Sequence, residues 1–347
     1  MKVLFVVTGF GFGDSVRTEC IIEELRSKKS KVMILGYDFS YEHFKRRFKT
    51  LKMHGYRFPD YDLEFKTVRF LMKNLHLPLK WFLTSTENMN EIKKFNPDIV
   101  VSDFEPVSNL IAKKIRKKCV TIFGYDPEEF RRLRNTNKRM RLQARYIERI
   151  YRSSDYVLIP SYKKKRNFGN IKYVNPIVRK FRIKNKKTVM KKLGLKKEPF
   201  IVMLGGSNYG IELAKRIKEL SKEFDEKFIF FGGKNKISKE HFSGFNENYL
   251  EYLSVCKGLI TLAGCLTINE GLAFKKPMLV FPIKNHVEQL INASSIRRYA
   301  YVAEDKNVNK HLISFMKNLN RYENIVKMAY MKFNGAEQVV KFLKEVI

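Results

Sequence analysis

The chain has 347 residues, 44% hydrophobic and 30% charged, which excludes a disordered tail, a collagen-like repeat and a small disulfide scaffold. Its 69 Lys and Arg against 35 Asp and Glu give a formal net charge of +34. Such a field attracts nucleic acid, anionic lipid or a phosphorylated substrate without choosing among them. The four cysteines are widely spaced and form no CxxC pair, which argues against a zinc or redox site.

The first half of the chain alternates short apolar runs with stretches of helical period. This alternation is typical of a parallel sheet with crossover helices. We expect strands at Val3–Val7, Val32–Leu35, Ile99–Val101 and Val120–Phe123, and helices at Ser15–Ser27 and Val107–Ile115. The apolar start has no signal-peptide cleavage site, and no apolar run approaches the ~18 residues of a membrane span. We therefore expect a cytoplasmic protein.

The same rhythm restarts after a basic segment. Arg179–Pro199 holds ten Lys or Arg and one Glu, a pattern that predicts a linker ending in a short basic helix. Strands are then expected at Phe200–Leu204, Phe228–Phe231, Leu259–Leu262 and Met278–Phe281, and helices at Ile211–Lys222, Thr267–Ala273 and Val287–Ser295. The chain is thus predicted to be α/β, with doubly wound domains over residues 1–180 and 181–330. A last helix within residues 331–347 is expected to be able to pack back on the first domain.

Glycines and carboxylates follow the strands of the first half. The turn Gly9–Gly13 leads into the first helix, whose free amides favour an anion, and Asp14 comes next. A dinucleotide site is not favoured, because the glycine spacing differs and the second strand lacks the expected terminal acid. Asp103 closes another strand. Because ligands bind at the carboxyl ends of parallel strands, Asp14 and Asp103 are candidates for a general base, and helix capping is the alternative.

The second half carries two comparable motifs. Gly205-Gly206-Ser207 follows one strand, and the segment Gly264–Glu270 follows another. Helix amides near Gly264 would hold a diphosphate, and Glu270, one turn into the helix, would accept both hydroxyls of a ribose. This arrangement would serve a nucleotide sugar.

These motifs resemble the donor half of GT-B glycosyltransferases, in particular the glycosyltransferase 28 (MurG-like) family. Order and spacing agree over residues 200–295, including Pro277, Pro282 and Asn292-Ala293, and the amino half matches more loosely. The resemblance implies two Rossmann-like domains facing across a cleft. It also implies transfer of a sugar from a nucleoside diphosphate donor, expected to be UDP-linked, to an acceptor hydroxyl, with no metal and no cofactor.

The resemblance further implies roles for individual residues. Glu270 would bind the ribose, Gly264–Leu266 the diphosphate, Phe245-Asn246 the uracil and Glu288-Gln289 the transferred sugar. Arg179 ends a segment similar to the family's Asn-Pro-Val-Arg hinge with one residue inserted, and would contact the diphosphate. The implied donor contacts are Gly13, Arg179, Gly206, Ser207, Phe245, Asn246, Gly264, Cys265, Leu266, Thr267, Glu270, His286, Glu288 and Gln289.

The expected catalytic base departs from the family pattern. Many members carry a histidine in the first glycine turn, and this chain has Asp14 at about that place. We therefore take Asp14 as the first candidate, Asp103 as the second and Glu105 as the third.

Two segments suggest how an acceptor is reached. Phe70–Leu83 contains the only Trp among large apolar and basic side chains, and Glu128–Arg152 holds nine basic and three acidic residues. Together they predict peripheral docking on the anionic inner face of a membrane and a lipid-linked acceptor. A core helix broken at Pro78 and a solvated basic helix are the alternatives.

Two other functions compete with sugar transfer. A GT-B nucleotide-sugar 2-epimerase would use the same donor site without an acceptor. A non-catalytic nucleic-acid-binding protein would account for the charge of +34, but no nucleic-acid-binding motif is visible, so nucleic acid is not an expected partner.

Overall fold

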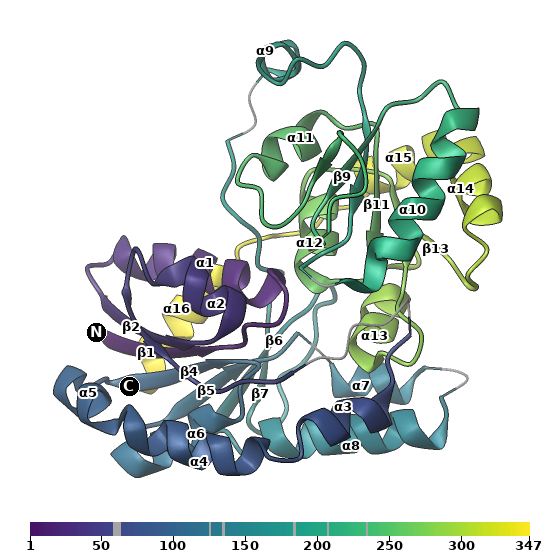
Figure 1. The fold of residues 1–347 in the computed structure, drawn as a ribbon. Coiled ribbons are helices and arrows are strands. Elements are labelled where there is room, and N and C mark those ends of the chain that lie inside the picture. The colour runs from purple at the N-terminus through teal and green to yellow at the C-terminus, as the bar shows by residue number, and fades with distance from the viewer. Residues whose placement is uncertain (58–63, 125, 134–135, 183–184, 207, 234) are drawn as a thin grey trace. The chain divides into compact units, whose positions relative to one another are not determined.

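Two parallel sheets organise the computed structural model (Figure 1). Unit 1 comprises Met1–Pro59, Lys66–Val178 and Lys332–Ile347, and unit 2 comprises Asp60–Phe65 and Arg179–Met331. The structure describes residues 1–57, 64–124, 126–133, 136–182, 185–206, 208–233 and 235–347.

The sheet of unit 1 has the strand order β3-β2-β1-β4-β5-β6-β7, with all described pairs parallel. Its strands are β1 (Lys2–Val7), β2 (Lys31–Gly36), β3 (Lys49–Lys52), β4 (Ile99–Asp103), β5 (Cys119–Ile122), β6 (Tyr156–Pro160) and β7 (Ile171–Val174). The chain winds outward from β1 to β3 on one side, and from β4 to β7 on the other. The loops after β1 and β4 therefore meet at a topological switch point, where α/β sheets bind ligands.

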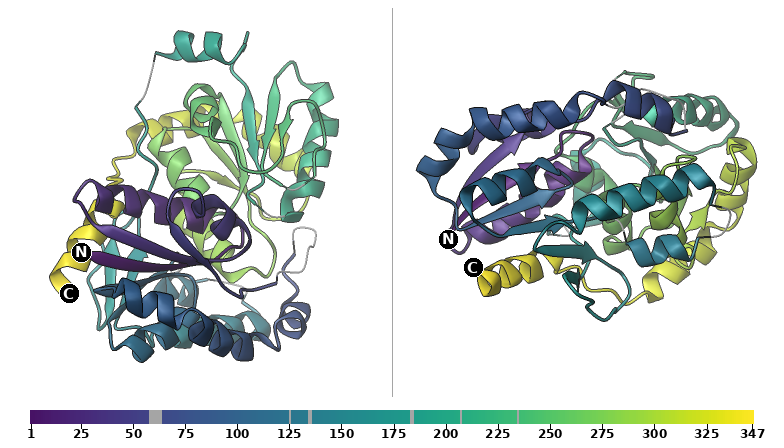
Figure 2. Two further views of the ribbon diagram at one scale, coloured as in Figure 1. Left: turned by 60° about the vertical axis from the view of Figure 1, so that its left-hand side comes forward. Right: turned by 90° about the horizontal axis from the view of Figure 1, so that it is seen from below.

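Helices cover both faces of this sheet because β1 is apolar on both. Val3, Phe5 and Val7 pack with α1 (Gly13–Arg26), α2 (Asp38–Phe44) and α16 (Gly335–Val346), whereas Leu4 and Val6 pack with α4 (Leu77–Glu87), α5 (Met89–Phe95) and α6 (Val107–Ile115). The remaining helices are α3 (Thr67–Lys73), α7 (Pro127–Arg131) and α8 (Lys138–Tyr151). Figure 2 shows α8 on the same side as α4 and α6.

The C-terminal helix α16 belongs to unit 1. Its Val339, Val340 and Leu343 are fully buried in the core shared with α1. A Cβ added at Gly335 would lie 1.9 Å from the carbonyl oxygen of Asn175, so only glycine allows this approach. Both chain ends consequently lie at one end of unit 1 (Figure 2).

Unit 2 has a smaller parallel sheet in the order β10-β9-β8-β11-β12-β13. Its strands are β8 (Phe200–Met203), β9 (Phe228–Phe231), β10 (His241–Phe242), β11 (Gly258–Leu262), β12 (Met278–Phe281) and β13 (Tyr301–Val302). Its helices are α9 (Lys186–Lys192), α10 (Ile211–Leu220), α11 (Tyr249–Val255), α12 (Cys265–Ala273), α13 (Val287–Ile296), α14 (Val308–Lys317) and α15 (Leu319–Met328), with short turns η1 (Asn208–Gly210) and η2 (Ser221–Glu223). The winding direction reverses between β8 and β11, which places a second switch point there.

The prediction of two doubly wound α/β units is confirmed, and the predicted strands lie within one or two residues of those observed. The edge strands β3, β7, β10 and β13 and the internal strand β6 were not predicted; β3 is polar, and β10 and β13 have only two residues each. The alternative of a core helix broken at Pro78 is close to what is observed: the helix is interrupted between α3 and α4, and Pro78 sits in the first turn of α4, where its missing N–H has no helical acceptor to lose. No helix in the described part of the chain is long and apolar enough to cross a bilayer.

Candidate functional site

The loop after β1 makes a tight glycine turn before α1. A Cβ at Gly9 would lie 1.9 Å from the carbonyl oxygen of Tyr37, which explains why glycine is required there. Gly13 is the first residue of α1, and Asp14 occupies its first turn with a side chain that is 25% exposed. A carboxylate in this position is stabilised by the helix dipole and remains accessible from solvent.

Asp103, at the end of β4, is fully buried and ion-paired. It accepts hydrogen bonds from Arg17 Nε at 3.2 Å, from Arg17 Nη2, and from the Thr18 hydroxyl at 2.7 Å. Arg17 Nη2 also donates to Asp14 Oδ1 at 2.5 Å. The two predicted carboxylates therefore lie close together, but a guanidinium that the sequence analysis did not single out bridges them. The three-residue spacing of Asp14 and Arg17 on one helix was the only available signal.

Glu105 is the second fully buried carboxylate among the three candidate bases. It is fully buried, and neither carboxylate oxygen accepts a hydrogen bond from the residues that the structure describes. Burial raises its pKa to about 8; the nearby Tyr37 and Thr8 hydroxyls offset this in part, and the charges of Asp14 and Asp103 add to it. Glu105 is thus a neutral acid near pH 7 with no surface that an acceptor could reach. The structure does not support it as the base.

The helix α12 begins at the switch point of unit 2, where β11 ends. Gly205, two residues after β8, takes a left-handed conformation (φ +71°) and is followed by Gly206, whereas Ser207 lies outside the described residues. After β11, Gly264 is extended and caps α12, which starts at Cys265. The first amides of a helix have no acceptor within it, and among the residues that the structure describes, chain neighbours apart, none has an atom within 4 Å of a Cβ built on Gly264. The amides of Cys265, Leu266 and Thr267 lie at the end of α12 that favours an anion.

Glu270 lies on α12, one turn beyond these amides. It is 1% exposed, and its two oxygens accept hydrogen bonds from Arg179, with Nε to Oε1 at 2.6 Å and Nη2 to Oε2 at 2.9 Å. The Arg179 guanidinium also lies over the ring of Tyr249, 5.5 Å from its centroid. The predicted ribose ligand and the predicted diphosphate ligand are therefore paired with each other in this structure.

Residues at the start of α13 contact the backbone that follows β11 and β12. Gln289 Oε1 accepts hydrogen bonds from the backbone amides of Ala263, at 3.3 Å, and Ile283, at 3.0 Å, so it ties the ends of β11 and β12 together. A sugar would then meet only the amide nitrogen of Gln289. Glu288 lies in the first turn of α13.

His286 caps α13 and packs edge-on against Phe65, with ring centroids 5.4 Å apart. Burial lowers its pKa to about 4, so the imidazole is neutral at physiological pH. A neutral imidazole can donate or accept a hydrogen bond to a donor sugar, and it does not add to the positive charge of unit 2.

Phe245 and Asn246, the expected uracil contacts, are not at the end of a strand. They follow β10 by three residues in irregular backbone, where Asn246 Oδ1 accepts from the Asn248 amide at 2.8 Å just before α11. Of the predicted site residues that the structure describes, Gly13, Asp14, Asp103 and Glu105 belong to unit 1 and the others to unit 2.

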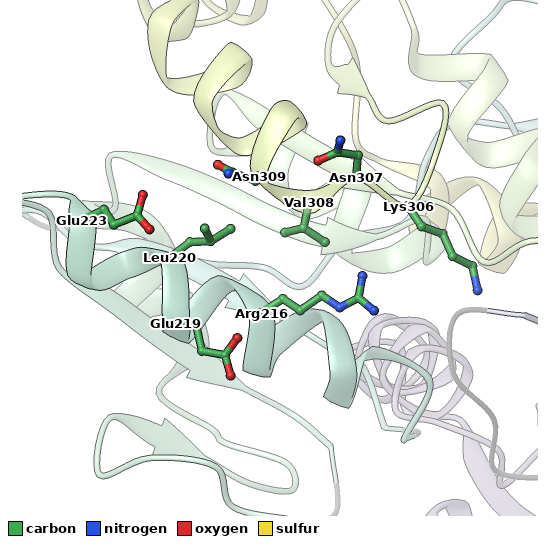
Figure 3. Close-up of a pocket in the computed structure, with 8 residues that line it drawn as sticks. All are labelled: Arg216, Glu219, Leu220, Glu223, Lys306, Asn307, Val308 and Asn309. Atoms are coloured by element: carbon green, nitrogen blue, oxygen red, sulfur yellow. The ribbon is translucent and has the colours of Figure 1, made fainter.

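A separate pocket of unit 2 lies between α10, η2 and the start of α14 (Figure 3). None of the predicted donor contacts lines it, and its acidic side chains offset its basic ones. The strand-end loops therefore remain the candidate site. The pocket is lined by Arg216, Glu219, Leu220, Glu223, Lys306, Asn307, Val308 and Asn309.

Comparisons with known proteins identify the family of this chain and chains of similar fold. A family model described as glycosyl transferase family 1 matches residues 1–320. A protein of Methanosarcina acetivorans described as an uncharacterized glycosyltransferase is 24% identical over 334 residues, covering 87% of this chain and 84% of that protein. A Bacillus cereus UDP-N-acetylglucosamine--N-acetylmuramyl-(pentapeptide) pyrophosphoryl-undecaprenol N-acetylglucosamine transferase 2 is 27% identical over 168 residues, 44% of this chain and 47% of that one. In structure, Arabidopsis thaliana UGT89C1 complexed with UDP-L-rhamnose matches with a TM-score of 0.62 at 12% identity, over 99% of this chain and 98% of that chain.

Proposed function

The chain belongs to glycosyl transferase family 1 and has a GT-B fold, and from this premise we propose that it transfers a sugar from a UDP-linked donor to an acceptor hydroxyl. The enzyme class follows from the family. The choice of UDP rests on the donor half of the chain, and is supported by the names of the Bacillus and Arabidopsis proteins, both of which include UDP.

One observation carries the donor assignment. The helix α12 begins at a switch point beside open space, and the carboxylate of Glu270 lies one turn further along the same helix. Helix amides suit a diphosphate, and a carboxylate suits the paired hydroxyls of a ribose. The two groups follow one another along α12 in the order in which a nucleoside diphosphate carries its phosphates and its ribose.

The reaction requires a base for the acceptor and stabilisation of the leaving group. The acceptor oxygen attacks the anomeric carbon and passes its proton to Asp14. The bond from the anomeric carbon to the diphosphate breaks, and its electron pair leaves with UDP. The amides at the start of α12 and the guanidinium of Arg179 stabilise the negative charge that develops on the diphosphate. We choose Asp14 over Asp103 and Glu105 because only its side chain has exposed surface.

A thermal-unfolding screen with UDP, GDP, dTDP and their sugars tests the donor. A ligand present at 100 times its dissociation constant adds about 2.7 kcal/mol of stability, and we expect this for UDP and one UDP-sugar. Stabilisation by none of the nucleotides would contradict the proposal. Conversion of the UDP-sugar alone into an isomer would instead identify an epimerase.

We also propose that unit 1 docks on an anionic membrane to meet a lipid-linked acceptor, as the name of the Bacillus enzyme suggests. The helices α3 and α4 expose large apolar side chains, and α8, which lies on the same side of the sheet as α4 (Figure 1), exposes basic ones. Apolar groups beside cations suit insertion among anionic head groups. The exposed apolar residues are Val68, Leu71, Met72, Leu75, Leu79, Phe82 and Leu83.

Trp81 does not take part in this surface, contrary to the sequence-based expectation. It is 8% exposed and packs edge-on against Tyr56 in the core beneath α4, with ring centroids 5.4 Å apart. Its neighbours Phe82 and Leu83 point to solvent instead. The helical period therefore divides the aromatic stretch between core and surface.

A further inference from the structure

Arg17 is a buried cation held between two carboxylates. The residue is 3% exposed, and its guanidinium donates to both oxygens of Asp103 and to Oδ1 of Asp14. Burial of a charge is costly unless the charge is paired and hydrogen-bonded. The two carboxylates meet this requirement together, so the position of Arg17 is defined from both sides.

Asp103 is the fixed end of this arrangement. Its backbone lies in β4, paired with β1 and β5, and its carbonyl accepts the amide of Thr8 at 3.1 Å. Its side chain is fully buried and also accepts the Thr18 hydroxyl. Because the strand and two donors of α1 hold this carboxylate, the guanidinium that forks onto it has little freedom to move.

Asp14 is the accessible end. Its side chain is 25% exposed, whereas the side chains of Arg17 and Asp103 are 4% and 0% exposed. The hydrogen bond from Arg17 Nη2 therefore orients Asp14, which is the most exposed of these three side chains. The network carries two negative charges and one positive, so Arg17 also balances part of the repulsion between Asp14 and Asp103.

We propose that Arg17 is a positioning residue for the reaction: anchored by Asp103, it fixes the Asp14 carboxylate in the orientation that accepts the proton of the acceptor hydroxyl. This inference rests on the proposed function, in which Asp14 is the base. Because Arg17 is 3% exposed, we expect it to act through Asp14 and not on the substrate directly. A misplacement of a catalytic group by about 1 Å costs on the order of 100-fold in rate, so the contribution of Arg17 is expected in kcat.

The test is Arg17→Lys, which keeps the charge but cannot fork onto Asp103 while reaching Asp14. The assay is hydrolysis of the UDP-sugar selected by the unfolding screen, with water in place of the acceptor and release of UDP as the readout. We expect kcat to fall by about 10- to 100-fold with KM for the donor unchanged. The matched control is Arg26→Lys in the exposed last turn of the same helix, which should keep the parent rate.

A double variant separates positioning from a structural role. In an Asp14→Asn background, Arg17→Lys should reduce kcat no further, because the group that it positions is already inactive. An equal fall in both backgrounds, or no fall in either, would overturn the inference. If Asp14→Asn itself keeps the parent rate, the proposed base is wrong, which is a distinct result. Should Arg17→Lys fail to fold, Thr18→Val removes one hydrogen bond to Asp103, and its milder loss of kcat must show the same dependence on Asp14.

Discussion

Arg179, where the main segment of unit 2 begins, and Glu270, 91 residues further along, form a two-point ion pair in which each carboxylate oxygen accepts one guanidinium hydrogen bond. A vicinal diol also offers two hydrogen-bond donors, so in the proposed function the ribose hydroxyls and Arg179 use the same two oxygens of Glu270. Replacing either partner should therefore change both the ion pair and donor binding.

Replacing Glu270 should weaken both donor binding and stability. Glu270→Gln keeps the shape but loses the charge, so we expect UDP binding to weaken by about 2 to 4 kcal/mol. The midpoint of thermal unfolding should also fall, because Arg179 loses its charged partner. Calorimetric titration with UDP measures the first effect. Glu251→Gln, which removes another carboxylate buried in an ion pair, with Lys192, should lower stability while UDP binds as before.

Replacing Arg179 should distinguish the diphosphate from the nucleoside. In Arg179→Gln, UDP is expected to bind at least about tenfold more weakly, since a charge-assisted contact to phosphate is lost. Uridine has no phosphate, and its affinity should stay within about threefold. Equal losses for UDP and uridine would show that Arg179 serves only to orient Glu270.

The choice of base predicts different effects for the two aspartates. Asp14→Asn should lower turnover by about 100-fold or more and lower the unfolding temperature less than Asp103→Asn does, because Arg17 keeps both contacts to Asp103. Asp103→Asn should destabilise the protein by about 3 to 5 kcal/mol, since it leaves the Arg17 cation buried without full compensation. Denaturant unfolding and donor turnover, measured on both variants, check the pair. Normal turnover in Asp14→Asn would exclude it as the base.

The raised pKa of Glu105 should make the free energy of unfolding depend on pH. Burial raises its pKa from 4.5 to about 8 in the folded protein, so between these values the unfolded chain binds fewer protons and stability falls as pH rises. The slope is about 1.4 kcal/mol per pH unit for one such group. Glu105→Gln removes this slope, so its stability relative to the parent should rise by a few kcal/mol between pH 5 and pH 8.

The control for this measurement is Glu42→Gln, whose side chain is 61% exposed beside Lys45. Its difference from the parent should stay constant over the same pH range. A constant difference for Glu105→Gln as well would show that Glu105 is ionised in the folded state.

If unit 1 docks on membranes, replacing its exposed apolar residues should reduce vesicle binding without affecting UDP binding. Leu75 and Leu79 are 83% and 65% exposed, so Leu75→Ser with Leu79→Ser should reduce sedimentation with phosphatidylserine-containing vesicles and leave UDP binding unchanged. Binding of the parent should also fade above physiological salt. Met328→Ser, at an equally exposed apolar residue of unit 2, is the control. Equal binding to neutral and anionic vesicles would contradict the proposal.

Local patterns in the sequence determined the elements and the class of fold. Apolar runs such as Val3–Val7 have no polar residue to face water, and they alternate with amphipathic stretches, which only a parallel sheet covered on both faces satisfies. Glycine turns and the helix start at Gly264 were visible for the same reason, since backbone conformation there depends on a few adjacent residues. Hence the strand-end motifs of both units were found before any contact was known.

Only the tertiary structure decided what these residues contact. Arg17 meets Asp103 across 86 positions, and Arg179 meets Glu270 across 91. No local pattern encodes such pairs, because they arise when β4 lies beside β1 and when the chain after Val178 reaches α12. The burial of Glu105 and Trp81 could not be predicted from the sequence either. Whether a polar or amphipathic side chain is buried depends on the packing around it and not on its residue type alone. The sequence could therefore identify the carboxylates, whereas three-dimensional packing determined which of them an acceptor can reach.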